Sequence, residues 1–518
     1  YIDLNANGVI DAGDWLVQQF NLTDGQAGMV IGGVTNFNVP GDTDATAGQI
    51  IAKLLFRNGD FMQNTAGQYI FKVSSPTGRF APIAGLFSVT NVPYPQKITG
   101  NVLVSGSSTA LSNAVVLLFP PPAPGKNGPG GSPVAGTVVN NAGSYSVSVP
   151  PGTYVPVAFK NNYLANFASP PLVSLGAGAT ISTNLTLLNT TSTISGTLMD
   201  ANNSSIGLPG VVLPVQSKNG LLAVTVTDTN GNFTVGVQSG QWEIKGDDTS
   251  LIVHGYLGLQ NGALVSAGQT GVTVAVPKAT ALCYGSVKDT LGNPMPGLDV
   301  YINDNNNSQY QTDAYTDANG NYVGAVLGGL GANDPWSISI SSDSNPANYV
   351  FSQPPFQQNG GANISAGTAL QASFTAMLAT NRVTGSLQAF GTNVPGVSVY
   401  AFATVNGTDF NTYTTTDNNG NYSLNVGNGS WVVGVNCSGD SDGLDNFLGS
   451  GNYQCPNNQT VNVNGSGAMA NFVVQSCNGV QIFTTSLPSG QAGSYYNVSL
   501  QGSSCSGMLN WYLNDPQD

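Results

Sequence analysis

Six residues near the start of the chain have the types and the spacing of a calcium-binding loop. In this pattern, ligands stand at positions 1, 3, 5, 7, 9 and 12 of a twelve-residue loop, and glycine stands at position 6. Calcium is a hard cation, so carboxylate, amide and main-chain carbonyl oxygens suit it. Gly8 occupies the turn position. The predicted ligands are Asp3, Asn5, Asn7, Val9 through its carbonyl, Asp11 and Asp14.

The loop resembles the calcium loops of dockerins and of calcium-binding surface-adhesin repeats, and this resemblance implies Ca²⁺ as a cofactor. One position departs from the pattern. Asp14 stands where Glu is usual, so its carboxylate reaches less far toward a cation. The alternative is an Asn/Asp turn without metal.

Residues for catalysis are scarce. His254 is the one histidine, and its neighbours Ile252 and Val253 predict that it lies in a strand. A Ser-His-Asp triad would have to use this residue, and the sequence has no nucleophile elbow of the Gly-x-Ser-x-Gly type. One histidine and scattered cysteines also argue against zinc. We therefore expect that the protein is not an enzyme.

A repeated motif determines the rest of the organisation. Four segments, roughly 95 residues apart, begin with a β-branched residue or Cys, a spacer and Gly. In three of them an Asp-x-Asn-Gly-Asn turn follows at the same offset and leads into an apolar-polar alternation typical of half-buried strands. The copies begin at Ile98, Ile194, Cys283 and Val383, and the three turns begin at Asp228, Asp317 and Asp417.

Each copy also has large aromatic residues suited to a core. Trp242 and Trp431 occupy the same repeat position as Tyr154. A shared position of this kind favours core packing over an exposed ligand platform. Short strands separated by turn residues at regular spacing predict β-sandwiches.

These motifs resemble carboxypeptidase-regulatory-like repeats of the transthyretin-like β-sandwich type over residues 98–475. The resemblance implies an all-β fold of tandem Ig-like domains forming an elongated rod, and modules of this kind act as spacers, stalks or adhesive units. The predicted domains are an N-terminal β domain at 1–97, repeats at 98–192, 193–280, 281–380 and 381–475, and a partial module at 476–518.

The last segment resembles the first half of a bacterial Ig-like module. We expect either that further residues complete it or that a strand from another chain does so. In the second case, head-to-tail self-association into filaments would follow, because non-closing contacts propagate.

Composition narrows the function classes. Charged residues make up 7% of the chain, and the net charge is −14. Nucleic-acid binding needs clustered cations, so we exclude it. No apolar run reaches about 18 residues, so no membrane-spanning helix is expected.

The cysteines and sequons indicate an extracellular or cell-surface location. The order of the late cysteines predicts two local disulfides, Cys437–Cys455 and Cys477–Cys505, and leaves Cys283 as a buried thiol. Glycans could supply the solubility that the few charged residues do not. The candidate glycosylation sites are Asn184, Asn232, Asn363, Asn406, Asn421, Asn428, Asn458, Asn464 and Asn497.

The sequence thus predicts an extracellular structural protein, a glycosylated subunit of a microbial surface fibril, sheath or stalk. Two alternatives remain: an adhesin or carbohydrate-binding array, and a non-catalytic region of a large secreted enzyme.

Overall fold

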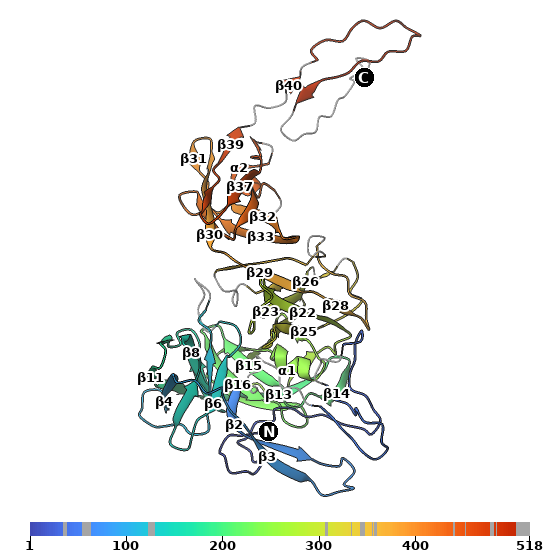
Figure 1. Cartoon of the computed structure of the whole chain (residues 1–518). Coiled ribbons are helices and arrows are strands. Elements are labelled where there is room, and N and C mark those ends of the chain that lie inside the picture. The colour runs from blue at the N-terminus through green and yellow to red at the C-terminus, as the bar shows by residue number, and fades with distance from the viewer. Residues whose placement is uncertain are drawn as a thin grey trace. The chain divides into compact units, whose positions relative to one another are not determined.

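The computed structural model is nearly all β-structure and forms two compact units (Figure 1). The first contains residues 1–347 and 354–374, and the second contains residues 348–353 and 375–518. The residues described are 1–34, 39–53, 64–122, 130–305, 309–332, 334–341, 348–354, 356, 360–438, 441–450, 452–476, 481–482 and 484–503.

The four repeats share one closing arrangement. The opening strand of each repeat pairs antiparallel with the strand after the turn and parallel with a strand from the end of the repeat. The opening strands are β4 (Lys97–Val104), β13 (Ser192–Asp200), β22 (Ala281–Asp289) and β30 (Asn381–Ala389). Their antiparallel partners are β7 (Ser144–Ser148), β17 (Asn232–Val237), β25 (Asn321–Val326) and β34 (Asn421–Val426). Their parallel partners are β11 (Thr180–Ser182) and β12 (Leu185–Asn189), β21 (Val272–Val276), β28 (Ala369–Gln371), and β38 (Ala468–Met469) with β39 (Phe472–Ser476).

The glycine of the repeated motif lies where the closing segment crosses the opening strand. A Cβ atom on Gly100 would stand 1.9 Å from the carbonyl oxygen of Thr183. The corresponding distances are 2.1 Å for Gly196, 1.9 Å for Gly285 and 1.7 Å for Gly385, in each case to a main-chain oxygen. No side chain fits in that space, so glycine is required for close main-chain approach.

The predicted turns are present and are held by the same hydrogen bonds. In the second repeat, the carboxylate of Asp228 accepts from the amides of Asn230 and Asn232, at 2.8 and 2.9 Å. Asp317 and Asp417 make the equivalent bonds. The preceding threonine is buried, as at Thr416, which accepts from the Val397 amide and donates to the Val394 carbonyl. These turns therefore act as structural connectors.

A second sheet completes each sandwich. In the first repeat it comprises β5 (Val115–Phe119), β6 (Ala135–Val138), β8 (Gly152–Phe159) and β10 (Val173–Leu175). In the second it comprises β15 (Val212–Ser217), β16 (Leu221–Val226), β18 (Gln241–Ile244) and β20 (Ala263–Ser266). In the third it comprises β23 (Asp299–Asp304), β24 (Tyr310–Tyr315) and β26 (Trp336–Ile340), and in the fourth β32 (Ser398–Val405), β33 (Thr408–Thr415), β35 (Gly429–Val435) and β37 (Gln459–Val463).

The aromatic residues predicted for the core are buried there. Trp242 is 1% exposed, and its indole donates to the Gln238 carbonyl at 2.9 Å. Trp431 is fully buried and donates to Gly427 at 3.0 Å. Tyr154 makes the equivalent bond to Pro150. Each ring thus fills the core while its polar atom is satisfied four residues upstream.

Strand pairing joins the repeats of the first unit. The strand β9 (Tyr163–Asn166) of the first repeat pairs with β16 of the second. The strand β19 (Gly258–Leu259) of the second repeat pairs with β24 of the third. The side chains of Val212, Leu222 and Val224 from the second repeat lie in the hydrophobic core of the first. Successive repeats in this unit are therefore joined by main-chain hydrogen bonds, and the first two also share a core.

The N-terminal segment also packs into the first repeat. The strands β2 (Thr65–Val73) and β3 (Ile83–Val89) form a hairpin. The strand β1 (Ile2–Asp3) pairs with β2, and β2 pairs in parallel with β6. Ile2, Trp15 and Tyr69 belong to the core cluster of the first repeat. The division into six domains stays a prediction.

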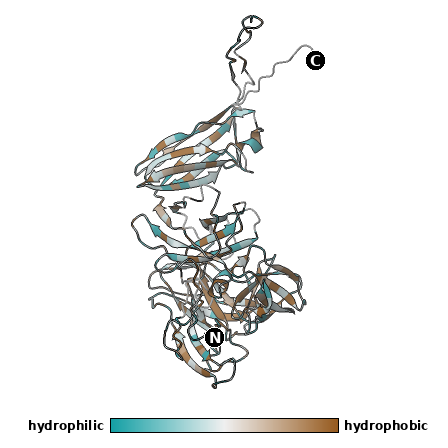
Figure 2. Cartoon of the chain, turned by 90° about the vertical axis from the view of Figure 1, so that its right-hand side faces the viewer, coloured by the Kyte–Doolittle hydropathy of each residue, from teal (hydrophilic) through white to brown (hydrophobic). Residues whose placement is uncertain are grey.

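The second unit has its own core, centred on Trp431, Phe410 and Phe472. Figure 2 shows hydrophobic and hydrophilic residues alternating along its strands, as expected where one face is buried. Its other elements are β27 (Tyr349–Phe351), which pairs with β29 (Phe374–Leu378), β31 (Thr392–Asn393), α2 (Leu444–Leu448), β36 (Tyr453–Gln454), and the short pair β40 (Gln481–Ile482) and β41 (Gly502–Ser503).

One local feature differs from the sequence-based expectation. The prediction of a strand around His254 is wrong: α1 (Asp248–Val253) ends there, because Asp247 caps the helix and competes with strand formation. In the second repeat, β14 (Asn203–Gly207) pairs with β13 at the edge of the sheet.

Gly100→Ala should destabilise the first repeat by about 1–3 kcal/mol, because the new methyl group overlaps a main-chain oxygen that cannot rotate away. Hydrogen exchange of the amides in β4 and β7 measures this local free energy of opening. Gly176→Ala is the matched control, because that exposed glycine has open space around its Cβ position. Equal protection in both variants would contradict the role assigned to the close approach.

Candidate functional site

The acidic loop at residues 3–14 begins and ends next to the core of the first repeat. The amide of Ile2 donates to the Trp15 carbonyl at 2.9 Å, and both side chains are buried. The amide of Leu4 donates to Asp14 Oδ1 at 3.0 Å. Gly8 has φ 78°, the left-handed conformation that the sixth loop position needs. The loop is therefore a preformed turn with fixed ends.

Hydrogen bonds organise the side chains of the loop. Asp3 is 1% exposed, and its two carboxylate oxygens accept from the amides of Asn7 and Gly8. The side-chain amides of Asn5 and Asn7 both donate to Asp11 Oδ2, at 2.6 and 3.0 Å. Burial raises the pKa of Asp14, and the nearby charges of Asp11 and Asp3 act in the same direction. Three carboxylates thus repel one another in a loop that contains no Lys or Arg.

The donor set fits calcium chemically, since it consists of carboxylates, amides and a main-chain carbonyl. The side chains are not gathered around a point, however. Among the residues that the structure describes, no group of three or more His, Cys, Asp and Glu side chains is placed to hold a metal ion. The amide nitrogens of Asn5 and Asn7 face Asp11. A cation would require these amides to turn their oxygens inward. Val9 is 62% exposed, as expected for a residue that contributes only its carbonyl.

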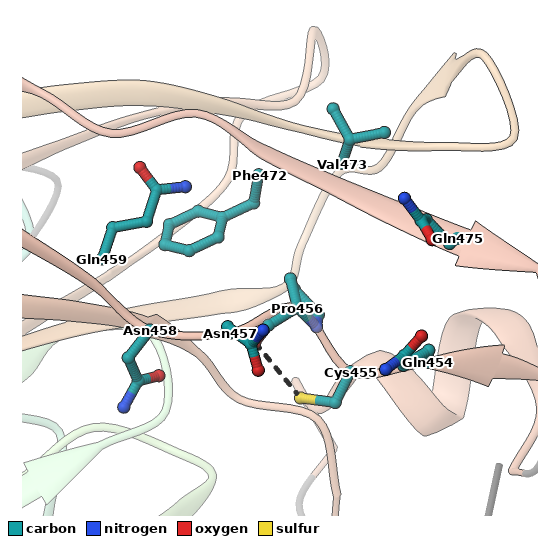
Figure 3. A pocket seen from close by; sticks show the side chains of 9 residues that line it. All are labelled: Gln454, Cys455, Pro456, Asn457, Asn458, Gln459, Phe472, Val473 and Gln475. Atoms are coloured by element: carbon teal, nitrogen blue, oxygen red, sulfur yellow. Dashed lines mark hydrogen bonds between the residues drawn. The ribbon is translucent and has the colours of Figure 1, made fainter.

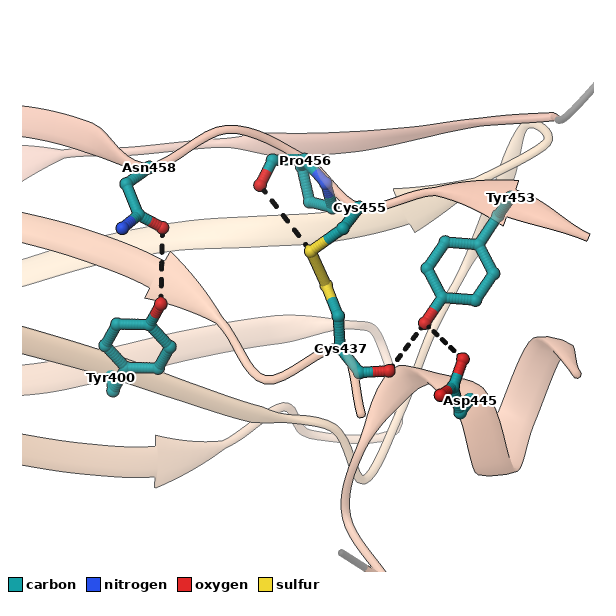
Figure 4. Close-up of a disulfide and its surroundings, with 7 residues drawn as sticks. All are labelled: Tyr400, Cys437, Asp445, Tyr453, Cys455, Pro456 and Asn458. Atoms are coloured by element: carbon teal, nitrogen blue, oxygen red, sulfur yellow. Dashed lines mark hydrogen bonds between the residues drawn. A yellow bond between two sulfur atoms is a disulfide. The ribbon is translucent and has the colours of Figure 1, made fainter. Parts of the chain in front are cut away.

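Cys437 and Cys455 form a disulfide, with a Cα–Cα distance of 6.0 Å and a sequence separation of 18 residues, as the sequence predicts (Figure 4). Tyr453 reinforces this link, because its hydroxyl hydrogen-bonds to the Cys437 carbonyl at 2.6 Å and to Asp445 at 2.8 Å.

Cys283 is fully buried and unpaired, and burial raises the pKa of its thiol. Cys477 and Cys505 lie outside the described residues.

His254 packs against Phe20, with ring centroids 5.4 Å apart. Desolvation lowers its pKa to about 4, so the imidazole is neutral at neutral pH. Its Nε2 atom is buried and has no hydrogen-bond partner. A catalytic histidine needs a positioned partner and access to substrate, and this side chain shows neither.

An acidic cluster between the second and third repeats was not anticipated. Lys245 lies 3.6 Å from the carboxylate of Asp248, which also accepts from the Asp313 amide at 3.1 Å. Desolvation raises the pKa of Asp248 to about 8. The charges of Asp313 and Asp247 add to this, and Lys245 opposes it. Short polar segments on separate repeats meet here only after folding, so the sequence gives no signal for the cluster.

A shallow hollow of about 430 Å³ opens between residues 454–459 and β39 in the second unit (Figure 3). No acidic or basic side chain lines it, so it offers hydrogen bonds and no proton-transfer group. Its lining residues are Gln454, Cys455, Pro456, Asn457, Asn458, Gln459, Phe472, Val473 and Gln475.

All nine candidate glycosylation sites are exposed, from Asn184 to Asn497. Some lie at turns, such as Asn406, which has φ 52° between β32 and β33. Their modification stays a prediction. Within the described part of the chain, helices are also too short to cross a bilayer.

No family model matches the sequence, and no curated protein matches it. Seventy-two chains of known structure match in fold. The Bacillus anthracis TIE protein is 12% identical with a TM-score of 0.17, over 70% of this chain and 68% of that one. A streptococcal ancillary pilin is 10% identical with a TM-score of 0.17, over 54% of this chain and 98% of that one. The major pilin subunit of Bacillus cereus is 10% identical with a TM-score of 0.15, over 55% and 99%.

At such identities and TM-scores, the likeness assigns neither family nor function. The fold class rests on the strand pairing of the chain itself, and the function has to be argued from its own surfaces.

Opening the Cys437–Cys455 disulfide should destabilise the second unit by about 3 kcal/mol, because it releases the loop-closure constraint on the unfolded chain. Hydrogen exchange in β35 and β37, with and without reductant, measures the change. The double variant Cys437→Ser with Cys455→Ser is the control and should not respond to reductant in these strands. Unchanged protection on reducing the native chain would contradict the prediction.

Proposed function

We propose that the protein is a structural component of the extracellular surface of a microbe, a subunit of a fibril, sheath or stalk. The observation that carries this proposal is the joining of successive repeats by strand pairing, through β9–β16 and β19–β24. Main-chain hydrogen bonds between repeats resist bending better than free linkers do. A load-bearing surface protein needs this property, whereas a string of independent binding modules does not.

The disulfide fits an oxidising compartment, and the scarcity of charge and the exposed sequons fit a glycosylated surface. We propose head-to-tail self-association as the route to a fibre. The segment 484–503 supports this idea, because its apolar side chains are exposed: Tyr495 is 92% and Leu487 is 49% exposed. Exposed residues of this kind are typical of contact surfaces.

Self-association should appear as a rise in sedimentation coefficient with concentration for the full chain. Deleting residues 476–518 should leave a monomer. Leu291→Ser is the matched control, since Leu291 is 85% exposed on the third repeat, outside that segment. Electron microscopy of native cell surfaces, with antibody against this chain, should label filaments or a sheath. A full chain that stays monomeric at high concentration would leave only a spacer or stalk role.

We also propose that calcium binds the loop at residues 3–14 and stiffens the N-terminal segment. The residues that flank the loop, Ile2 and Trp15, are buried in the core of the first repeat. Calcium binding to the folded loop would therefore stabilise the folded state of that repeat. The cation would offset the repulsion among Asp3, Asp11 and Asp14. It would compete with the amide protons that now bond to Asp11.

Calorimetric titration of the calcium-stripped chain should show one site, and saturation at about 100 times Kd should stabilise the fold by about 2.7 kcal/mol. Asp11→Ala should abolish binding and leave the core of the first repeat folded, because Asp11 is exposed and the hydrogen bonds it accepts from Asn5, Asn7 and Gly13 lie within the loop. Asp317→Ala is the matched control, because its turn has a similar sequence but no ligands at the later loop positions. A flat titration at millimolar calcium would exclude the site.

A further inference from the structure

The second unit presents an aromatic face on the outer side of its β33-β32-β35-β37 sheet. Along β32, Val399 and Ala401 are buried in the core, whereas Phe402 is 46% exposed. Tyr400 pairs directly with Tyr413 of β33, which is 77% exposed. Because directly paired residues share a sheet face, Tyr400, Phe402 and Tyr413 lie together on the side away from the core. We call these three residues the aromatic face.

Two rings of the aromatic face are nearly parallel to each other, and one of them crosses the neighbouring strand. The Tyr400 and Phe402 centroids are 6.5 Å apart, and their planes differ by 17°. Gly434 pairs with Tyr400 on the next strand, and a Cβ there would stand 2.5 Å from the Tyr400 ring. The missing side chain lets the ring lie across β35. The Tyr400 hydroxyl then reaches Asn458 Oδ1 at 3.3 Å (Figure 4).

Polar groups border the aromatic face, and all but the Asp409 carboxylate are uncharged. Asn458 also lines the hollow of about 430 Å³, together with the amide side chains of Gln454, Asn457, Gln459 and Gln475 (Figure 3). At the other end, Thr404 donates to Asp409 at 2.6 Å. Amides can both donate and accept, as sugar hydroxyls do. Arg382 is the only Lys or Arg after residue 288, so the surface has no cluster of cations to attract a polyanion.

The residue type at the position of Tyr413 differs between repeats, and it matches the segment that covers this sheet face. Counting back from the shared Thr-Asp turn, Tyr413 corresponds to Val224 in the second repeat and to Asp313 in the third. Val224 is buried in the core of the first repeat. The Asp313 amide donates to Asp248 of α1. Where a neighbouring repeat covers this face, the residue suits that contact, but in the fourth repeat it is an exposed tyrosine.

We propose that the aromatic face and the amide-lined hollow bind a neutral polysaccharide. The apolar side of a pyranose ring would stack on Tyr413 and on the nearly parallel rings of Tyr400 and Phe402, because its C–H groups are attracted to the negative face of an aromatic ring. Sugar hydroxyls would bond to the Asn458 amide and to those in the hollow, which requires that the candidate glycosylation site Asn458 is unmodified. This activity goes beyond a structural role, because it would attach the fibre or stalk to a glycan matrix.

Affinity electrophoresis of the full chain tests the proposal in gels containing hydroxyethyl cellulose, laminarin or galactomannan, with alginate as the polyanionic comparison. At least one neutral polymer should retard the native chain, and alginate should not. Tyr413→Ala and Phe402→Ala should each weaken binding about tenfold, because each removes one stacking ring. Phe390→Ala is the matched control, since Phe390 is 53% exposed in a turn away from this sheet.

Circular dichroism should show that all three variants keep the native melting temperature, since the substituted side chains are exposed. Retardation by a neutral polymer that is lost in Tyr413→Ala and Phe402→Ala and kept in Phe390→Ala supports the proposal. No retardation by any of the neutral polymers overturns it, as does retardation that the face variants leave unchanged. Retardation by alginate alone also overturns it. Should Tyr413→Ala instead abolish self-association without any polysaccharide binding, the face is a contact between copies of this chain and the proposal is wrong.

Discussion

The sandwiches depend on a close crossing of two main-chain segments. In every repeat, the oxygen of the closing segment approaches the glycine of the opening strand so nearly that a Cβ would lie 1.7–2.1 Å from it. This crossing lets the last strands pair in parallel with the first, which closes each repeat on itself. The buried aromatic side chains then fill the space between the two sheets. Tyr145 and Tyr322 also donate to the crossing segment, at the carbonyls of Thr183 and Ala372.

Hydrogen bonds between side chains and main-chain groups stabilise the turns of this chain, which has few charged residues. The turn aspartates bond to main-chain amides, and the threonine before each turn satisfies two buried main-chain groups, as Thr316 does between Leu298 and Met295. An ion pair joins Lys245 to Asp248, at 3.6 Å. The hydrogen bonds of the buried threonines should be little affected by salt, because screening acts mainly on exposed charges.

The same sheet face serves different purposes along the chain. In the second repeat it packs into the core of the first through Val212 and Val224, and in the third it meets α1 through Asp313. In the fourth, Phe402 and Tyr413 are exposed. A repeat can change the role of this face without changing its core, because side chains on the two faces of a strand alternate. The structural and binding proposals are therefore compatible within one architecture.

The sequence by itself determined the features that depend on neighbouring residues. The Asp-x-Asn-Gly-Asn turns, the strand alternation, the core positions of Trp242 and Trp431 and the Cys437–Cys455 pair could all be predicted, because local turn chemistry, side-chain periodicity or short separation defines each of them. The turn at Gly8 could be predicted from the spacing of its loop as well, whereas calcium binding by that loop stays a prediction. What only the tertiary structure decided were contacts between distant segments. Gly100 is required because the main chain at Thr183 passes close to it. The acidic cluster forms only when Asp248 and Asp313, which lie on different repeats, come together. The aromatic face forms only when β32 and β33 pair in the observed register. These contacts depend on which strands become neighbours. The alternation of apolar and polar residues along a strand shows that it has two different faces, but it does not show which segment will cover each face.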